Sequence, residues 1–287
     1  MALLVCATPS AAQSKATSVD GSLAYSHVER LVGFGPRPPG SPAIAKAQIY
    51  ITEILKKLNL QVEHQDFLAN TPNGPVSMKN IVGKTSQSGR PVVIIASHYD
   101  TRLMTNAAFV GANDGGSSTG LLLELARVLS QRRNAFTVWF VFFDGEEAQR
   151  EWSETDSLYG SRYFVEKLKT DGQTQAVKAM VLMDMVGDRD LKLENDLSST
   201  PRLMELVRKS AVELGYSKYL AASQKGMVDD HVPFIRAGIP AVDLIDFEYG
   251  FNLWHTPNDT LDKISPHSLK IVGDIVVRLI ENLGQKP

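Results

Sequence analysis

Cysteine is almost absent from this sequence, because the 287 residues contain only Cys6. Cys6 lies in an apolar opening segment that is followed by small residues of the kind that signal peptidase cuts. We predict that residues 1–13 are the remnant of a signal peptide, which implies a secreted or periplasmic location. A disordered N-terminus and a lipid attached to Cys6 are the alternatives. Without Cys6 no disulfide is possible, and a metal ion would have to be held by histidine and carboxylate side chains.

Long apolar runs and an excess of charge are also absent. No apolar stretch approaches the ~20 residues that span a bilayer. A net charge of −2 gives no reason to expect nucleic acid or an anionic membrane as a partner. No internal repeat or linker divides the chain, so we expect one domain over residues 14–287 and a monomer.

Short apolar runs alternate with helical patterns. Four runs show little polar alternation and are expected as strands buried on both faces: 91–96, 136–143, 179–183 and 241–245. Residues 61–67 alternate like a half-buried strand. Helical spacing of apolar residues follows Ser41-Pro42 and Ser265-Pro266 and recurs within 121–129 and 203–211. This order predicts an α/β fold of three layers, in which a mostly parallel central sheet carries helices on both faces.

Polar residues follow several of the predicted strands, where ligands of such sheets bind. Two histidines and three carboxylates form a set that suits zinc: His98, Asp114, Glu147, Asp184 and His255. Glu146 stands beside one of them. Two adjacent glutamates at a strand end repel each other unless a cation lies close, so one could bind zinc while the other acts as a general base.

Each of these signals has a second interpretation. If His98 binds a metal, Asp100 could orient its ring or belong to a second metal site. The alternative is that His98 is a hydrogen-bonded histidine at a strand end. Asp114 could cap a helix, although the flanking glycines favour a backbone held close to another group. The glutamate pair could lie in a solvated loop. Asp184 interrupts an apolar run, and a buried carboxylate must be paired, ligated or protonated.

Several other polar residues are candidates for the same site or for the surface. Asp229, Asp230 and Asp243 are further candidates, and His231 could cap the helix that Val-Pro-Phe begins. Residues 14–27 are polar and are expected to be loose. The three histidines in amphipathic or polar contexts are expected at the surface: His27, His64 and His267.

Taken together, these motifs resemble the M28 zinc peptidase superfamily from residue 35 to the helix after Ser265. The closer resemblance is to the glutaminyl-peptide cyclotransferases, of a bacterial type. It rests on Phe-Asp-Gly-Glu-Glu-Ala at 143–148, Trp-Ser at 152–153, Asp-Ser-Leu-Tyr-Gly-Ser-Arg at 156–162, Asp-Asp-His-Val-Pro-Phe at 229–234 and Leu-Trp-His-Thr at 253–256. The stretch at 152–162 is the most specific of these marks.

The resemblance implies a role for each matching residue. In that family one zinc is bound by the residues that match Asp114, Glu147 and His255. Glu146 matches the general acid/base, and the residues that match the proton-relay carboxylates and the pocket aromatics are Asp184, Asp229, Trp152 and Trp254. Two-metal aminopeptidases of the superfamily hold a second zinc through residues that match His98 and Asp184, so the sequence leaves a second metal open.

Three functions remain from the sequence. The first is a cyclotransferase that converts N-terminal glutamine of peptides into pyroglutamate, the second a two-zinc aminopeptidase, and the third a non-catalytic binding protein. The chain departs from the animal cyclotransferases at Val228, where they have glutamate, at Asp243, where they have histidine, and in the loop 246–253. These changes leave the mechanism intact but put the pocket rim and the substrate preference in doubt.

Overall fold

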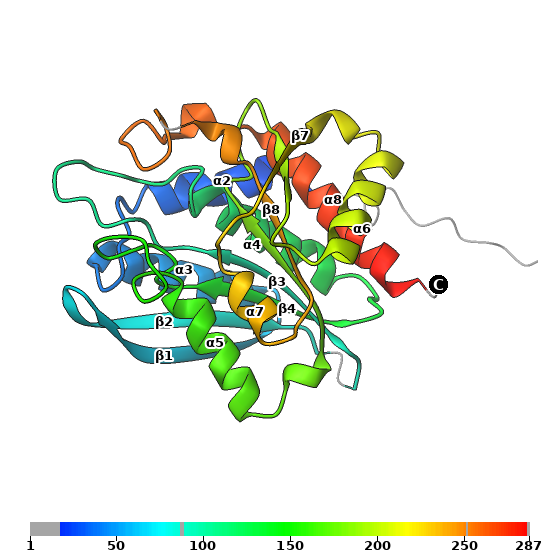
Figure 1. Ribbon diagram of the computed structural model, residues 1–287, viewed down its shortest axis with the longest axis horizontal. Coiled ribbons are helices and arrows are strands. Elements are labelled where there is room, and N and C mark those ends of the chain that lie inside the picture. The colour runs from blue at the N-terminus through cyan, green and yellow to red at the C-terminus, as the bar shows by residue number, and fades with distance from the viewer. Residues whose placement is uncertain (1–17, 87–88, 251, 286–287) are drawn as a thin grey trace, which may run out of the picture.

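A six-stranded sheet forms the centre of the computed structural model, which describes residues 18–86, 89–250 and 252–285 (Figure 1). Its strand order is β1-β2-β4-β3-β5-β8. The bounds are Gln61–Thr71, Gly74–Lys84, Thr137–Phe143, Val92–His98, Val177–Asp184 and Ala241–Ile245, in that order. The last four of these strands are parallel, whereas β1 and β2 form an antiparallel hairpin at one edge. A small second sheet pairs β6 (Leu193–Asp196) with β7 (Leu220–Lys225).

Helices cover both faces of the sheet. One core packs the side of Ile95 and Phe140 against five helices: α2 (Gly21–Val32), α3 (Pro42–Lys57), α4 (Gly116–Ser130), α6 (Pro201–Glu213) and α8 (Pro266–Gly284). The other core packs the side of Ile94 and Val141 against α5 (Tyr159–Thr170) and α7 (Val232–Arg236). Neighbouring strand residues thus face opposite cores, which explains why the strands are apolar throughout. The predicted three-layer α/β fold is confirmed.

The predicted element starts are also confirmed where a cap marks them. Ser41 and Ser265 each accept a hydrogen bond from a backbone N–H three residues on, at 3.1 Å, and a proline follows each. Such a cap satisfies one of the N–H groups that a helix start leaves unpaired. Both helices therefore begin at the predicted residue.

Three expectations differ from the structure. Residues 21–32 form α2 rather than a loose segment, because Asp20 caps the helix and Ala24, Val28 and Leu31 are fully buried. His27 is buried, not at the surface, and its Nδ1 lies 2.6 Å from the Tyr50 hydroxyl. Strand β2 was not predicted, since its glycines and proline mask the alternation. His64 and His267 are exposed, as expected.

The predicted signal remnant, residues 1–13, lies outside the described residues. No helix of the described part is both long and apolar enough to cross a membrane.

Candidate metal centre and cavity

The carboxyl ends of three neighbouring parallel strands place most of the predicted site residues together. His98 is the last residue of β3 and Asp184 is the last residue of β5, while Glu146 and Glu147 follow β4. Because these strands are parallel and adjacent, their ends lie on one edge of the sheet. Loops that precede α4 and α8 bring in the remaining two predicted ligands.

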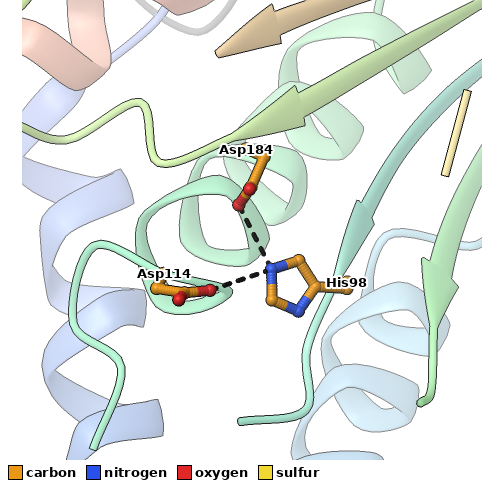
Figure 2. A group of neighbouring side chains, drawn as sticks. All are labelled: His98, Asp114 and Asp184. Carbon is orange, nitrogen blue, oxygen red and sulfur yellow. Dashed lines mark hydrogen bonds and ion pairs between the residues drawn. The ribbon is translucent and has the colours of Figure 1, made fainter. Parts of the chain in front are cut away.

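Asp114 lies between two histidines and joins two groups of candidate ligands. Its Oδ1 is 3.2 Å from His98 Nε2, and its Oδ2 is 3.3 Å from His255 Nε2. On the first side, His98 Nε2 also lies 3.1 Å from Asp184 Oδ1 (Figure 2). On the second side, His255 Nε2 lies 3.0 Å from Glu147 Oε1. In each group of three, one ligand atom per residue lies within 4.8 Å of the others.

The glycines beside Asp114 allow this close approach. Gly115 has φ +70°, and a Cβ there would lie 2.7 Å from the Asp100 carbonyl oxygen and 2.9 Å from His98 Cε1. The interpretation of Asp114 as the helix cap is wrong, because Gly115 occupies the capping position of α4. The backbone is held close to another group, as the glycines indicated, and that group is the His98 ring.

Two buried residues that sequence reasoning did not single out support this loop. Asp259 accepts hydrogen bonds from the N–H groups of Asn113 (2.8 Å) and Asp114 (3.1 Å) and from the Tyr249 hydroxyl (2.7 Å). Burial and the charge of Asp114 nevertheless raise the pKa of Asp259 to about 7. Its sequence context, a polar turn after Pro257, gives no signal of such a role.

Arg37 is the second of these residues. Its guanidinium is fully buried and donates to the backbone carbonyls of Tyr99 (3.1 Å), Val110 (2.8 Å) and Gly111 (3.2 Å). It therefore ties the segment after His98 to the loop that carries Asp114. The proline-rich sequence around Arg37 gives no signal of this function.

Asp100 holds the two glutamates. Its carboxylate oxygens accept the backbone N–H groups of Glu146 (3.2 Å) and Glu147 (3.3 Å), and Oδ1 lies 3.5 Å from His98 Nδ1. Asp100 belongs to neither group of candidate ligands. Asp100 thus lies behind the candidate ligands, beside the His98 ring, and its role in orienting that ring stays a prediction.

Glu146 is buried and lies outside both ligand groups. Its Oε2 is 4.0 Å from His98 Nδ1. Burial raises the pKa of Glu146 well above its usual value, and the charges of Asp229 and Glu147 add to the effect while His98 opposes it. Burial and then the charge of Asp184 likewise raise the pKa of Asp229 to about 7. Carboxyl groups with raised pKa values suit the transfer of protons near neutral pH.

A cavity of about 380 Å³ opens above these groups. Trp152 and Trp254 both line it, and Trp254 stacks on His255 with ring centroids 4.1 Å apart. Apolar walls around a few convergent polar groups are typical of small-ligand sites. The sequence did not indicate seven further lining residues: Arg102, Met185, Lys225, Gly226, Met227, Ile245 and Phe247.

The donor set and its unpaired atoms fit zinc. Asp114 Oδ2 and Glu147 Oε2 are buried without a hydrogen-bond partner among the described residues. Such atoms are costly unless a cation is bound. Each group contains one histidine–carboxylate hydrogen bond, His98 Nε2 with Asp184 Oδ1 at 3.1 Å and His255 Nε2 with Glu147 Oε1 at 3.0 Å. Asp184 Oδ1 also accepts the Met185 N–H at 2.8 Å. The Asp114–Glu147–His255 group is therefore the one whose carboxylate oxygens most need a metal.

Comparisons with known proteins identify the family of the chain. The model of peptidase family M28 matches residues 80–280. A glutaminyl-peptide cyclotransferase-like protein from Bos taurus is 31% identical over 278 residues, which cover 86% of this chain and 72% of that protein.

Solved structures extend the similarity to the whole chain. An Acidobacteriales bacterium glutaminyl cyclase superposes with a TM-score of 0.91 at 36% identity, over 100% of both chains. A leucine aminopeptidase precursor from Bacteroides thetaiotaomicron VPI-5482 superposes with a TM-score of 0.86 at 27% identity, over 94% of this chain and 99% of that one. The predicted resemblance is confirmed, and the chain belongs to peptidase family M28, whose members are zinc-dependent.

Proposed function

We propose that the protein is a glutaminyl-peptide cyclotransferase, which closes the N-terminal glutamine of a peptide into pyroglutamate and releases ammonia. The observation that carries this proposal is the similarity along the full chain to a glutaminyl cyclase, at 36% identity. The retained Glu146, buried in the cavity wall beside a metal-capable glutamate, argues against a non-catalytic binding protein.

One zinc ion would be held by Asp114, Glu147 and His255. The unpaired oxygens of Asp114 and Glu147 support this choice. When bound, zinc supplies Lewis-acid polarisation of the γ-amide carbonyl and stabilises negative charge on its oxygen.

The side chains of the protein would perform the proton transfers. The α-amine of the substrate has a pKa of about 7.7–8.0 and needs a base to be fully nucleophilic. Glu146 would take a proton from this amine as its nitrogen bonds to the δ-carbon, which is the carbonyl carbon of the side-chain amide, and would return it to the amide nitrogen as the carbon–nitrogen bond breaks. Asp184 and Asp229 would share this proton with Glu146 during the transfer. The leaving group departs as ammonia, so atoms and protons balance without water.

Alignment of the substrate contributes the rest. Because the attacking amine and the amide belong to one residue, the enzyme gains little from gathering reactants, but ring closure needs a folded side chain. Good alignment can lower the barrier by as much as ~7–11 kcal/mol. Trp152 and Trp254 would clamp the methylenes of the glutamine and exclude water.

A two-zinc aminopeptidase is the second candidate. It is favoured by the intact group of His98, Asp114 and Asp184 and by the similarity to a leucine aminopeptidase precursor. The hydrogen bonds of Asp184 Oδ1 to His98 Nε2 and to the Met185 N–H support the one-zinc proposal instead, because they satisfy this carboxylate oxygen without a metal.

Location, origin and assembly remain predictions. A secreted or periplasmic location depends on the composition of residues 1–13, and a bacterial origin on the absence of other cysteines. A monomer and a specificity for N-terminal glutamine belong to the same proposal.

Mass spectrometry of three peptides tests the function. The zinc-loaded protein is incubated with peptides that begin with glutamine, with leucine, and with N-acetylglutamine, whose blocked amine cannot attack. We expect the first peptide to lose one ammonia and the other two to stay intact. Release of the first residue from the glutamine or leucine peptide would instead establish an aminopeptidase.

A further inference from the structure

A third group of metal-capable side chains lies outside the cavity lining. Asp196 ends β6, His231 precedes α7, and Asp243 lies within β8. Their exposed fractions are 2%, 0% and 0%. The three residues come from segments that are distant in sequence, so the tertiary fold alone brings them together.

The contacts within this group are too long or poorly oriented for hydrogen bonds. His231 Nε2 lies 3.2 Å from Asp196 Oδ2, and His231 Nδ1 lies 3.9 Å from Asp243 Oδ2. Both ring nitrogens of His231 and both carboxylate oxygens of Asp243 lack a hydrogen-bond partner among the described residues. One ligand atom from each of the three residues nevertheless lies within 4.8 Å of the others. The side chains thus face a common point without bonding to one another.

Asp196 accepts hydrogen bonds from the Ser198 and Met227 N–H groups and from the Ser199 hydroxyl, but the carboxylate of Asp243 has no donor among the described residues. Asp229 and Asp230 are also buried, and neither Asp196 nor Asp243 pairs with a lysine or arginine in the described part of the chain. Burial, together with the charges of Asp229 and Asp184, raises the pKa of Asp243 well above its usual value. Buried carboxylates without donors require either bound protons or a cation.

Two other buried carboxylates allow a comparison with Asp243, one with hydrogen-bond donors and one with an unpaired oxygen. Asp246 is fully buried but satisfied, because it accepts the N–H groups of Lys192 (2.7 Å) and Glu248 (3.0 Å). Glu147, in the proposed zinc group, keeps an unpaired buried oxygen. Asp243 resembles Glu147 rather than Asp246, since both of its side-chain oxygens are unpaired.

We infer that Asp196, His231 and Asp243 form a separate buried site for a divalent transition-metal cation, with zinc as the ion that this donor set suits best. An imidazole with two carboxylates favours zinc, whereas calcium and magnesium take oxygen ligands. The site is structural, because no substrate reaches it through the cavity lining.

The cation would fix the position of a cavity residue. It joins the small sheet, through Asp196, to the central sheet, through Asp243. His231 lies two residues after Asp229, which lines the cavity. Asp196 already contributes to this segment, because it accepts the Met227 N–H at 2.9 Å. The ion would therefore hold the segment 227–231 against both sheets.

Metal content tests the inference without any measurement of activity. Asp114 belongs to both groups at the cavity, so Asp114→Ala removes the binding capacity of both. Elemental analysis after zinc loading and gel filtration should find one zinc per chain in this variant. The double variant Asp114→Ala/His231→Gln should contain none, while Asp114→Ala/His267→Gln, which changes an exposed histidine, should retain it. An Asp114→Ala protein free of metal would overturn the site.

Anomalous X-ray scattering from wild-type crystals gives an independent answer if a variant fails to fold. Data at the zinc edge should show a peak between Asp196, His231 and Asp243, apart from the peak near Asp114. A map without that peak would show that protons, not a cation, neutralise these carboxylates. Neither result depends on whether the protein cyclises glutamine.

Discussion

The two groups that share Asp114 have similar side chains and one histidine–carboxylate hydrogen bond each, but they differ in the carboxylate oxygens that stay unpaired. Asp184 Oδ1 is bonded to His98 Nε2 at 3.1 Å, and the Met185 N–H is a second donor to it. On the other side, Glu147 and Asp114 each keep a buried oxygen without a partner. A list of ligand types therefore cannot separate a metal site from a hydrogen-bonded cluster, whereas unpaired atoms can.

The largest expected effect comes from removing one histidine on each side. His255→Ala should lose the zinc held with Asp114 and Glu147 and abolish turnover, because the Glu147 side depends on the metal. It should therefore contain one zinc fewer per chain than the wild type, and the ion proposed at Asp196, His231 and Asp243 should remain. His98→Ala should keep the zinc content of the wild type. Elemental analysis of the wild type and both variants measures this difference directly. A loss of one zinc in His98→Ala would break the comparison and indicate a two-metal centre.

The next effect separates the adjacent glutamates. Glu146→Gln should lower turnover of a glutamine peptide by about 10²–10⁴-fold, the usual contribution of a general acid/base. The zinc content should equal that of the wild type, because Glu146 belongs to none of the groups of candidate ligands. Peptide kinetics and elemental analysis on one preparation provide the check. Loss of zinc here, with retention in Glu147→Gln, would mean that the two roles are exchanged.

A smaller effect concerns the backbone beside His98. Gly115→Ala should destabilise the fold by more than Gly215→Ala, although the two glycines have φ +70° and +73°. A Cβ at Gly115 meets the Asp100 carbonyl and the His98 ring, whereas a Cβ at Gly215 meets nothing within 4 Å. A left-handed residue alone costs about 1–3 kcal/mol. If denaturant titrations showed that both variants lose the same free energy of unfolding, a steric constraint beside His98 would be disproved.

The smallest effect on activity is expected at Asp246, a buried carboxylate outside both groups. Burial raises its pKa to about 7, despite two N–H donors. A carboxyl whose pKa is higher in the folded than in the unfolded state loses stability as the pH rises from about 4 to about 7. Asp246→Asn lacks this titration, so its free energy of unfolding should fall less over this range, by up to about 4 kcal/mol. If the free energies of unfolding of the two proteins changed equally with pH, the raised pKa of Asp246 would be contradicted.

Sequence reasoning located the candidate ligands because the carboxyl ends of parallel strands lie together at one edge of the sheet. A polar residue at the end of a fully apolar run, such as His98 or Asp184, must lie at the carboxyl edge of the sheet. Asp259 and Arg37 were not identified as site supports because both act through backbone groups of distant loops. Such contacts leave no periodicity or motif in the sequence.

The sequence by itself determined the layer order, the buried strands and the residue types that converge at their ends. Apolar periodicity and helix caps are local properties, so they can be read along the chain. Only the tertiary structure decided that Asp114 joins both groups, that His98 pairs with Asp184, and that Asp196, His231 and Asp243 face one point. These facts depend on side-chain positions set by loops and on which buried atoms remain unpaired, because contacts between distant segments are fixed only when the chain packs.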